Sequence, residues 1–98
     1  MTGKTGALDE LRARIDELDD EILELIQKRA AVALEIGQAK KRRALAVTDR
    51  PREKAVLDRL TNKSQGRLLK GQAIRDIYSA IIQACRAVQA PPGSEEEA

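Results

Sequence analysis

The sequence predicts an all-α protein made of three helices, one very long, one short and one of medium length. Apolar residues recur every three or four positions through the first half of the chain, which fits one face of a helix and no strand. Phe and Trp are absent and Tyr78 is the single aromatic residue, so the core must consist of Leu, Ile, Val and Ala, as in helix bundles. No proline precedes Pro51, so nothing interrupts a long first helix.

The first predicted helix begins near Ala7 and ends at about Arg43. Its apolar stripe consists of Leu8, Leu11, Ile15, Leu18, Ile22, Leu25, Val32 and Ile36. A helix of this size is about 54 Å long, longer than a small domain is wide. The stripe must therefore pack on other helices or on a second copy of the chain, and a second copy would also enlarge the small core of a 98-residue protein.

Arg29 occupies a position of this stripe that would normally hold Leu or Ile. Its side chain either reaches out to solvent or holds an anion inside the bundle, because a buried guanidinium needs an anionic partner. Lys40 follows eleven residues later, close to three turns, so both cations lie on one face about 16 Å apart along the axis. Between them stand Ala33, Ile36 and Gly37, which leave room for an anion of metabolite size.

Other cations of the first helix have simpler explanations. The cluster Lys41–Arg43 complements the negative end of the helix dipole. Arg12 precedes Arg29 by 17 residues, about 25 Å, which is too far for both to reach one small ligand from a single straight helix. If Arg12 belongs to the same site, it must come from another copy of the chain.

Two further helices are expected after the first. Thr48 or Asp49 can cap a second helix from about Arg50 to Asn62, which tolerates Pro51 in its first turn. A turn-rich loop then leads to a third helix, from about Lys70 to Gln89, with apolar residues at helical spacing.

The domain organisation follows from these helices. Residues 1–6 are predicted to form a flexible arm, residues 7–90 a single helical domain, and residues 91–98 a disordered acidic tail. The lone Cys85 allows no intramolecular disulfide, and no apolar signal segment opens the chain, so we expect a cytoplasmic protein. No uncharged stretch is long enough to span a membrane.

Composition excludes most familiar catalytic sites. The chain has no His, one Cys and no glycine-rich phosphate loop, so zinc sites of the Cys and His kind, Ser-His-Asp triads and P-loops lack their residues. The net charge is +2, which suits an anionic ligand but is weak for a nucleic-acid binder.

Three separated blocks of the sequence resemble the all-helical chorismate mutases. The blocks are LDELRARIDELDDEILELIQKRAAVALEIGQAK, TDRPRE and IYSAIIQACRAVQ, which cover nearly the whole chain from about Leu8 to Gln89. The resemblance implies an intertwined helical homodimer that converts chorismate to prephenate in the biosynthesis of Phe and Tyr. It implies an intramolecular Claisen rearrangement that uses no cofactor, no metal and no covalent intermediate.

The resemblance also implies roles for individual residues. Arg29 and, from the partner protomer, Arg12 would hold the carboxylates of chorismate by bidentate hydrogen bonds. Lys40 and Gln89 would donate to the ether oxygen, on which negative charge grows as its bond to carbon breaks.

A second group of residues would hold the other side of the substrate. Glu53 would accept a hydrogen bond from the substrate hydroxyl, although its position alone favours a first-turn partner of the helix dipole over a catalytic acid. Asp49 and Arg52 would line the mouth of the site. Cys85 stands where the family often has Ser, so it would contact a carboxylate as a weaker thiol donor or would only pack the third helix. The expected catalytic residues are Lys40, Gln89, Arg29 and Glu53.

Three other functions remain open at the level of sequence. The lyase that splits isochorismate into salicylate and pyruvate resembles the mutase in fold and cationic pocket, but the match at Gln89 favours the mutase. A helical dimerisation module explains the long helix but not Arg29 in its stripe. A nucleic-acid binder that uses Lys40–Arg43, Arg50 and Arg52 would lack aromatic stacking groups. We therefore expect a small-molecule ligand and neither a nucleic acid nor a membrane as partner.

Overall fold

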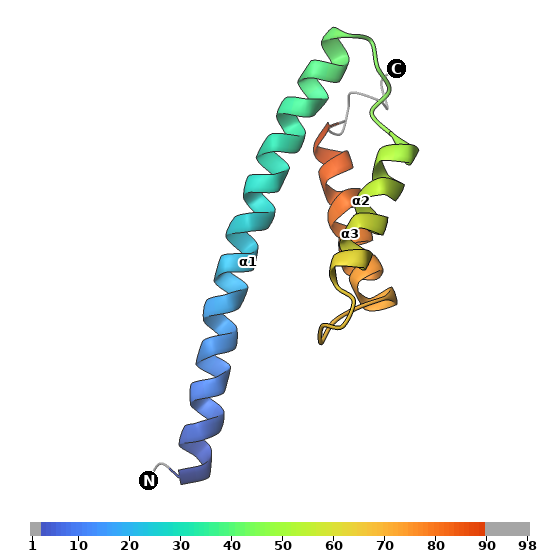
Figure 1. Cartoon of the computed structure of the whole chain (residues 1–98). Coiled ribbons are helices and arrows are strands. Elements are labelled where there is room, and N and C mark those ends of the chain that lie inside the picture. The colour runs from blue at the N-terminus through green and yellow to red at the C-terminus, as the bar shows by residue number, and fades with distance from the viewer. Residues whose placement is uncertain (1–2, 90–98) are drawn as a thin grey trace.

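The computed structural model describes residues 3–89, and this part of the chain contains three α-helices and no strand (Figure 1). The helices are α1 (Gly3–Arg42), α2 (Arg50–Lys63) and α3 (Gln72–Gln89). The predicted all-α class, with one very long, one short and one medium helix, is confirmed. Residues 1–2 and 90–98, which include the predicted acidic tail, lie outside the described residues.

Helix α1 sets the largest dimension of the chain. It is 40 residues long, and the longest principal extent of the structure is 62 Å. The helix begins at Gly3, before the predicted start near Ala7, so Gly3–Gly6 belong to α1 and not to the expected arm. Lengthening a formed helix by one turn needs no new nucleation, which lets this glycine-containing segment join it. Neither α1 nor the shorter helices of the described range combines the length and apolarity needed to cross a bilayer.

A Schellman motif ends α1 and turns the chain toward α2. The amide of Leu45 donates to the Lys40 carbonyl at 2.8 Å, and the amide of Ala44 donates to the Lys41 carbonyl at 3.1 Å. Ala44 adopts the left-handed conformation, with φ of 57°, at the position where this motif usually has Gly. These two bonds satisfy carbonyl groups that the end of a helix would otherwise leave free.

The ends of α2 and α3 have equally local causes. Asp49 caps α2, as one of the two predicted caps, since its Oδ1 accepts from the amide of Arg52 at 3.1 Å. Helix α3 begins at Gln72, two residues after the predicted Lys70. The reason is Gly71, whose φ of 61° cannot continue a right-handed helix, although its carbonyl accepts from the amide of Arg75 at 3.1 Å.

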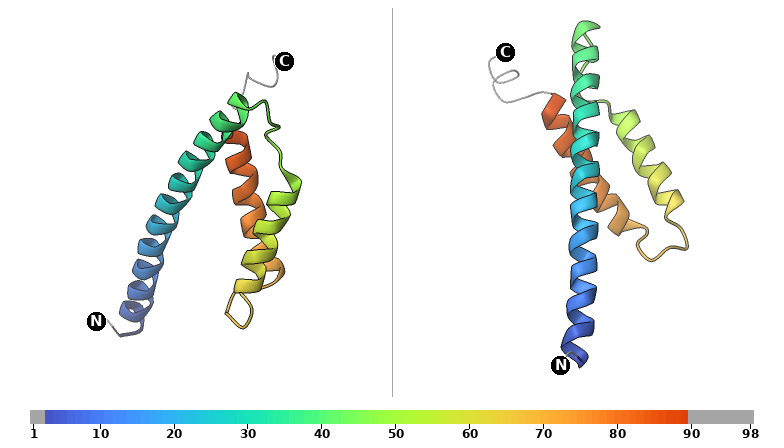
Figure 2. Two further views of the ribbon diagram at one scale, coloured as in Figure 1. Left: turned by 45° about the horizontal axis from the view of Figure 1, so that its top comes forward. Right: turned by 90° about the vertical axis from the view of Figure 1, so that its left-hand side faces the viewer.

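Helix α3 is the element that holds the chain together. It packs against both α1 and α2, whereas α1 and α2 do not approach each other closely (Figures 1 and 2). Within the described residues the buried apolar side chains are few and come from all three helices: Ala33, Val56, Ile82 and Cys85. The core of one chain is therefore small and lies where the second half of α1 meets α3.

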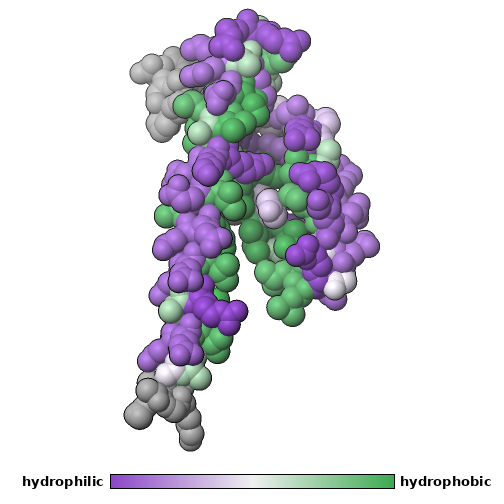
Figure 3. All heavy atoms as spheres, turned by 60° about the vertical axis from the view of Figure 1, so that its left-hand side comes forward, coloured by the Kyte–Doolittle hydropathy of each residue, from purple (hydrophilic) through white to green (hydrophobic). Residues whose placement is uncertain are grey.

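The first half of α1 has no helix beside it. In Figure 1 and in the right-hand view of Figure 2 it extends past the other two helices toward the N-terminus. Its predicted stripe is about half exposed, at 48% or more for each of Leu8, Leu11, Ile15, Leu18, Ile22 and Leu25. Figure 3 shows apolar side chains along one edge of this half and charged ones on the rest of the visible face. A single chain thus leaves a long apolar surface without a partner.

Candidate active site

A cavity of about 370 Å³ lies between the second half of α1, the start of α2 and the second half of α3. Its polar lining consists of Arg29, Lys40, Asp49, Arg52, Glu53, Arg86 and Gln89. Its remaining lining consists of Val32, Ala33, Ile36, Val47, Val56, Ile82 and Cys85. The structure therefore brings seven of the eight predicted site residues to one cavity. The volume of this cavity suits a small organic ligand.

Lys40 and Gln89 form the central polar pair of the cavity. Lys40 Nζ donates to Gln89 Oε1 at 3.0 Å and to the Val47 carbonyl at 2.7 Å. An ammonium has three protons, so one remains for a ligand, and with Oε1 accepting from Lys40 the Gln89 Nε2 group has its two protons for the same purpose. Both side chains are partly buried, which strengthens hydrogen bonds to a ligand relative to those in open water.

Gly37 allows α1 and α3 to approach closely at this pair. A Cβ added to Gly37 would lie 3.0 Å from both Cα and Cβ of Gln89, and 3.1 Å from its Cγ. Such a contact is tighter than ordinary packing, so any larger residue would displace Gln89 by a few tenths of an ångström. The sequence marked Gly37 only as a small residue that leaves room; its contact with Gln89 is a finding of the structure.

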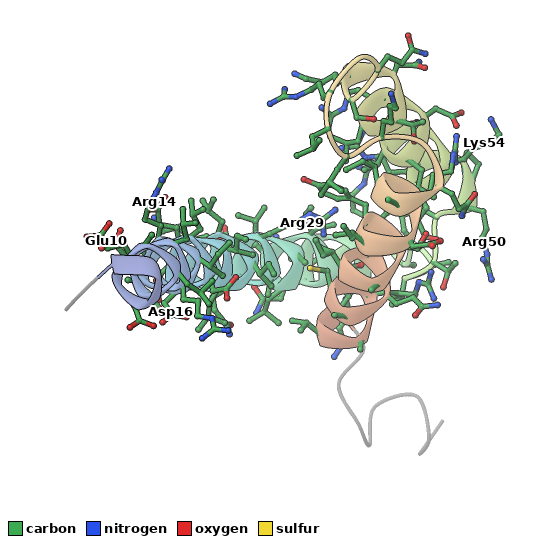
Figure 4. All side chains as sticks on the ribbon, turned by 90° about the horizontal axis from the view of Figure 1, so that it is seen from below. Glu10, Arg14, Asp16, Arg29, Arg50 and Lys54 are labelled. Atoms are coloured by element: carbon green, nitrogen blue, oxygen red, sulfur yellow. The ribbon has the colours of Figure 1, made fainter. Side chains whose placement is uncertain are left out.

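Arg29 lies on the same face of α1 as Lys40 and is half-buried. In Figure 4 it lies on the part of α1 that is next to α3. The ion pairs within residues 3–89 are Lys54–Asp58, Arg75–Asp58 and Arg86–Glu53. None of them uses Arg29, Lys40 or Arg52, so these three cations of the cavity are available to an anion.

Asp49 and Arg52 stand at the exposed side of the cavity. Both positions are fixed by the start of α2, where Asp49 accepts the Arg52 amide as its N-cap. The cap leaves the guanidinium of Arg52 unpaired within the described residues. Both residues thus line the cavity and are exposed, while their role at the mouth and their contacts with a substrate remain predictions.

Glu53 and Arg86 form a bidentate ion pair across the cavity wall. Arg86 Nε donates to Glu53 Oε2 at 3.0 Å and its terminal nitrogen donates to Oε1 at 2.8 Å. The hydrogen bonds to Glu53 raise the pKa of the Arg86 guanidinium above its ordinary value, against a smaller opposing effect of desolvation. Arg86 is a site residue that sequence reasoning missed. The available signal was its position on α3, one turn before Gln89 and one turn after Ile82.

Cys85 is 4% exposed and unpaired, and it belongs to the apolar side of the cavity next to Ile82. It both packs α3 and borders the space for a ligand. The expected contact of its thiol with a carboxylate remains a prediction.

Arg12 is the predicted site residue that the cavity lacks. It is exposed and lies on the free half of α1, where Figure 4 shows its neighbours Glu10 and Arg14 far from Arg29. One chain therefore cannot bring Arg12 to its own cavity, in keeping with the distance expected along a straight helix.

The chemistry that this cavity allows is electrostatic. Among the described residues no group of His, Cys, Asp and Glu side chains is arranged to hold a metal ion, and the chain has no His to move protons. What the cavity offers is fixed hydrogen-bond donors and unpaired cations set against apolar walls. Such donors and cations can bind a small organic anion and can stabilise negative charge that develops on it.

Fold and cavity together define a small all-α protein with a cavity whose lining is rich in cations. Residues 11–90 match the family described as chorismate mutase type II, and this match covers most of the chain. The chain belongs to the type II chorismate mutase family, as the resemblance of its three sequence blocks predicted.

Individual relatives agree with this family. The chain is 35% identical over 85 residues to the bifunctional chorismate mutase/prephenate dehydratase of Aquifex aeolicus, which covers 84% of this chain and 24% of that protein. It is 29% identical over 82 residues to the chorismate mutase of Methanocaldococcus jannaschii, covering 84% of this chain and 83% of that protein. The chain thus spans about a quarter of the bifunctional relative and most of the other protein.

A solved structure shares the fold. It is a conserved hypothetical protein from Pyrococcus furiosus, with a TM-score of 0.69 and 34% sequence identity. The alignment covers 85% of this chain and 95% of that one.

Proposed function

We propose that this chain is a chorismate mutase that converts chorismate to prephenate for the biosynthesis of Phe and Tyr. The observation that carries this proposal is the pair Lys40 and Gln89 at the cavity wall. Lys40 Nζ donates to Gln89 Oε1 at 3.0 Å, and the ammonium and the Gln89 Nε2 group keep protons for a ligand beside unpaired cations. Membership of the type II family and the named activity of the Methanocaldococcus relative support it.

The donor pair suits the charge distribution of the rearrangement. The ether bond of chorismate breaks while a carbon–carbon bond forms within the same molecule, and negative charge grows on the ether oxygen. Donors fixed at that oxygen stabilise the transition state more than the ground state, and removal of one such donor typically lowers the rate about 100-fold to 1000-fold. The Val47 carbonyl and Gln89 Oε1 hold the ammonium of Lys40 in place before the substrate arrives.

The cations fix the reactive conformation. Chorismate has two carboxylates and a flexible enolpyruvyl ether, which must fold over the ring before the new bond can form. Arg29 binds one carboxylate from within the chain, and Arg12 of a second copy binds the other, each by a bidentate guanidinium contact. Holding both ends of the folded ether lowers the activation barrier, because the entropy of orientation is lost on binding and not in the chemical step. This requires no nucleophile or proton carrier.

The second copy is part of the same proposal. One chain presents an exposed apolar stripe on α1 and, near the loop between α2 and α3, an open apolar hollow lined by residues such as Leu60, Leu69 and Tyr78. In an intertwined homodimer the free half of α1 crosses to the partner, where its stripe is buried and its Arg12 reaches the partner's cavity. The proposed cytoplasmic location rests on the sequence alone.

The first experiment is to mix the purified protein with chorismate, follow the loss of its ultraviolet absorbance and identify the product by chromatography. Prephenate is the expected product. Formation of salicylate and pyruvate from isochorismate in place of prephenate from chorismate would reassign the chain to the lyase. A folded dimer that turns over neither compound would contradict an enzymatic function.

A mixing experiment tests the shared site. Arg12→Ala and Lys40→Ala should each be nearly inactive alone, because each removes one part of every site. When the two variants are unfolded together and refolded, about half of the dimers are mixed, and each mixed dimer has one intact site. We expect recovery of about a quarter of the wild-type activity. No recovery in verified mixed dimers would contradict the contribution of Arg12 across the interface.

A further inference from the structure

Arg86 is the one charged side chain among the described cavity residues to which neither the sequence motifs nor the proposed mechanism gives a role. It lies on α3, whereas its partner Glu53 lies in the first turn of α2. The pair therefore joins two helices at the wall of the cavity.

The geometry of the pair restricts the Glu53 carboxylate strongly. Each carboxylate oxygen accepts one N–H from the planar guanidinium, at 3.0 Å and 2.8 Å. The side chains are 28% and 19% exposed, so the contact is partly shielded from water. Two parallel bonds fix both the position and the plane of a carboxylate, which one bond from a lysine would not do.

The pair leaves Glu53 able to accept further hydrogen bonds. A carboxylate has about four lone-pair sites, and Arg86 uses two of them. With its negative charge already balanced, Glu53 suits a neutral donor, such as a hydroxyl group, better than another cation. Because Glu53 lines the cavity, that donor can belong to the ligand.

Without Arg86 the same carboxylate would compete with the ligand. Arg29, Lys40 and Arg52 line the cavity with it, and none of them has a carboxylate partner within residues 3–89. A released Glu53 would be attracted to these cations and would neutralise the charges that a dianionic substrate needs.

We propose that Arg86 is a positioning residue of the active site: it holds Glu53 where the carboxylate accepts the substrate hydroxyl and keeps it away from the substrate-binding cations. This inference rests on the proposed mutase function. Arg86 itself touches Glu53 and acts on the reaction only through it.

The chain supplies a matched control for the purely structural effect of such a pair. Arg75 on α3 donates to Asp58 on α2 at 2.6 Å, and neither residue lines the cavity. Both pairs thus join an arginine of α3 to a carboxylate of α2. Arg75→Met removes an arginine–carboxylate pair between the same two helices at a distance from the site, although this pair has one hydrogen bond and Asp58 also accepts from Lys54.

The experiment compares kcat and KM for chorismate in wild type, Arg86→Met, Arg75→Met, Glu53→Gln and the double variant Arg86→Met/Glu53→Gln. We expect Arg86→Met to lower kcat/KM about 10-fold to 100-fold, the range for loss of a hydrogen bond to a charged group. The kcat/KM of Arg75→Met should stay within about twofold of wild type. Its urea midpoint should fall by about as much as that of Arg86→Met. In the Glu53→Gln background, loss of Arg86 should cost less than about threefold, because the two residues act as one unit.

A second substrate separates positioning from packing. With a chorismate analogue whose ring hydroxyl is replaced by hydrogen, the bond to Glu53 is absent, so the part of the Arg86→Met effect that depends on it should disappear.

If Arg86→Met fails to fold, as judged by circular dichroism and gel filtration, Arg86→Lys is the second variant. It keeps the charge but loses the planar guanidinium that makes two parallel hydrogen bonds. That variant should lose about threefold to tenfold in kcat/KM.

The outcomes separate this inference from the function on which it rests. A folded wild-type dimer without chorismate turnover overturns the proposed function and this inference with it. An active wild type in which Arg86→Met behaves like Arg75→Met overturns only the role of Arg86. So does a loss from Arg86→Met that is equally large in the Glu53→Gln background.

Discussion

The two halves of α1 share one helical periodicity and have opposite surroundings. The second half, from Arg29 to Lys40, packs on α3, lines the cavity and includes the buried Ala33 and Gly37. The first half has no helix beside it and lines no cavity with its stripe. Exposure alone does not separate the halves, since Leu18 is 51% exposed while Val32 and Ile36, at the open cavity, are 54% and 45% exposed. A sequence stripe of constant period thus becomes a cavity wall in one half and an unpartnered surface in the other.

This difference is the reason to propose a second copy of the chain. Its second half supplies donors and cations for a site, but the core that supports this site has only four buried apolar residues among those described. Burial of the first half against a second copy would enlarge the core and complete the set of cations together. Stability and activity are therefore expected to depend on the two halves in different ways.

The largest expected effect is the loss of kcat on substitution of Lys40, in the second half of α1. Lys40→Ala removes the donor held between Val47 and Gln89, and we expect kcat to fall about 100-fold to 1000-fold while the helical fold is kept. Lys41→Ala, which removes the adjacent exposed charge, is the control and should leave kcat within about twofold. Steady-state kinetics with chorismate measures both, and wild-type turnover in Lys40→Ala would contradict the proposed role.

The next largest effect is a loss of stability on substitution in the apolar stripe of the first half of α1. Leu18→Ala should lower the free energy of unfolding by at least about 2 kcal/mol per chain, because a dimer would bury this side chain. Urea unfolding followed by circular dichroism gives the value, with Glu17→Ala as the control outside the stripe. A change for Leu18→Ala within about 0.5 kcal/mol would mean that the stripe remains in water, and it would contradict the intertwined dimer.

A smaller effect distinguishes positioning from packing in the second half. Gly37→Ala places a Cβ 3.0 Å from the backbone and Cβ of Gln89, so the donor pair must shift by a few tenths of an ångström. We expect kcat to fall about tenfold, since misplacement by 1 Å can cost about 100-fold. Helix propensity gained by Ala should offset part of any loss in stability. Gln38→Ala is the control, and an unchanged kcat in Gly37→Ala would show that the contact does not position Gln89.

The smallest effect concerns the turn at the end of the second half. Ala44 adopts a φ of 57° in the Schellman motif, which costs a residue with a Cβ more than it costs Gly. Ala44→Gly should raise the free energy of unfolding by up to about 1 kcal/mol and leave kcat unchanged. A lower free energy of unfolding in the same urea assay would mean that the entropy of Gly in the unfolded chain outweighs the relieved strain.

Much of the fold was predictable from the sequence because each helix has a local cause. The three-four spacing of apolar residues specifies α1, and the Asp49 cap with Pro51 specifies the start of α2. The family is confirmed, and the cavity gathers the predicted residues of a single chain, although their roles stay predictions. The position of Arg12 was also foreseeable, because rise per residue alone puts it out of reach of Arg29.

Two contacts of the cavity could not be predicted from the sequence, because they depend on how the helices face each other. The partner of Arg86 is Glu53, 33 residues away on another helix, and their meeting depends on the relative rotation of α2 and α3. The close contact of Gly37 with Gln89 likewise requires the distance between α1 and α3. The start of α1 at Gly3 was not predicted, because the low helix propensity of Gly3 and Gly6 argued against it. Adding a turn to an existing helix needs no new nucleation, so the helix extends through them.

The bond from Lys40 Nζ to the Val47 carbonyl has a consequence for sequence drift in the connector between α1 and α2. A carbonyl oxygen is present whatever side chain the residue has, so residue 47 can be replaced by many others without loss of this bond. An insertion or deletion between residues 43 and 48 would instead move the carbonyl away from the ammonium. Loops usually tolerate changes of length better than helices do. In this loop, variation in length should be the rare event and variation in residue type the common one.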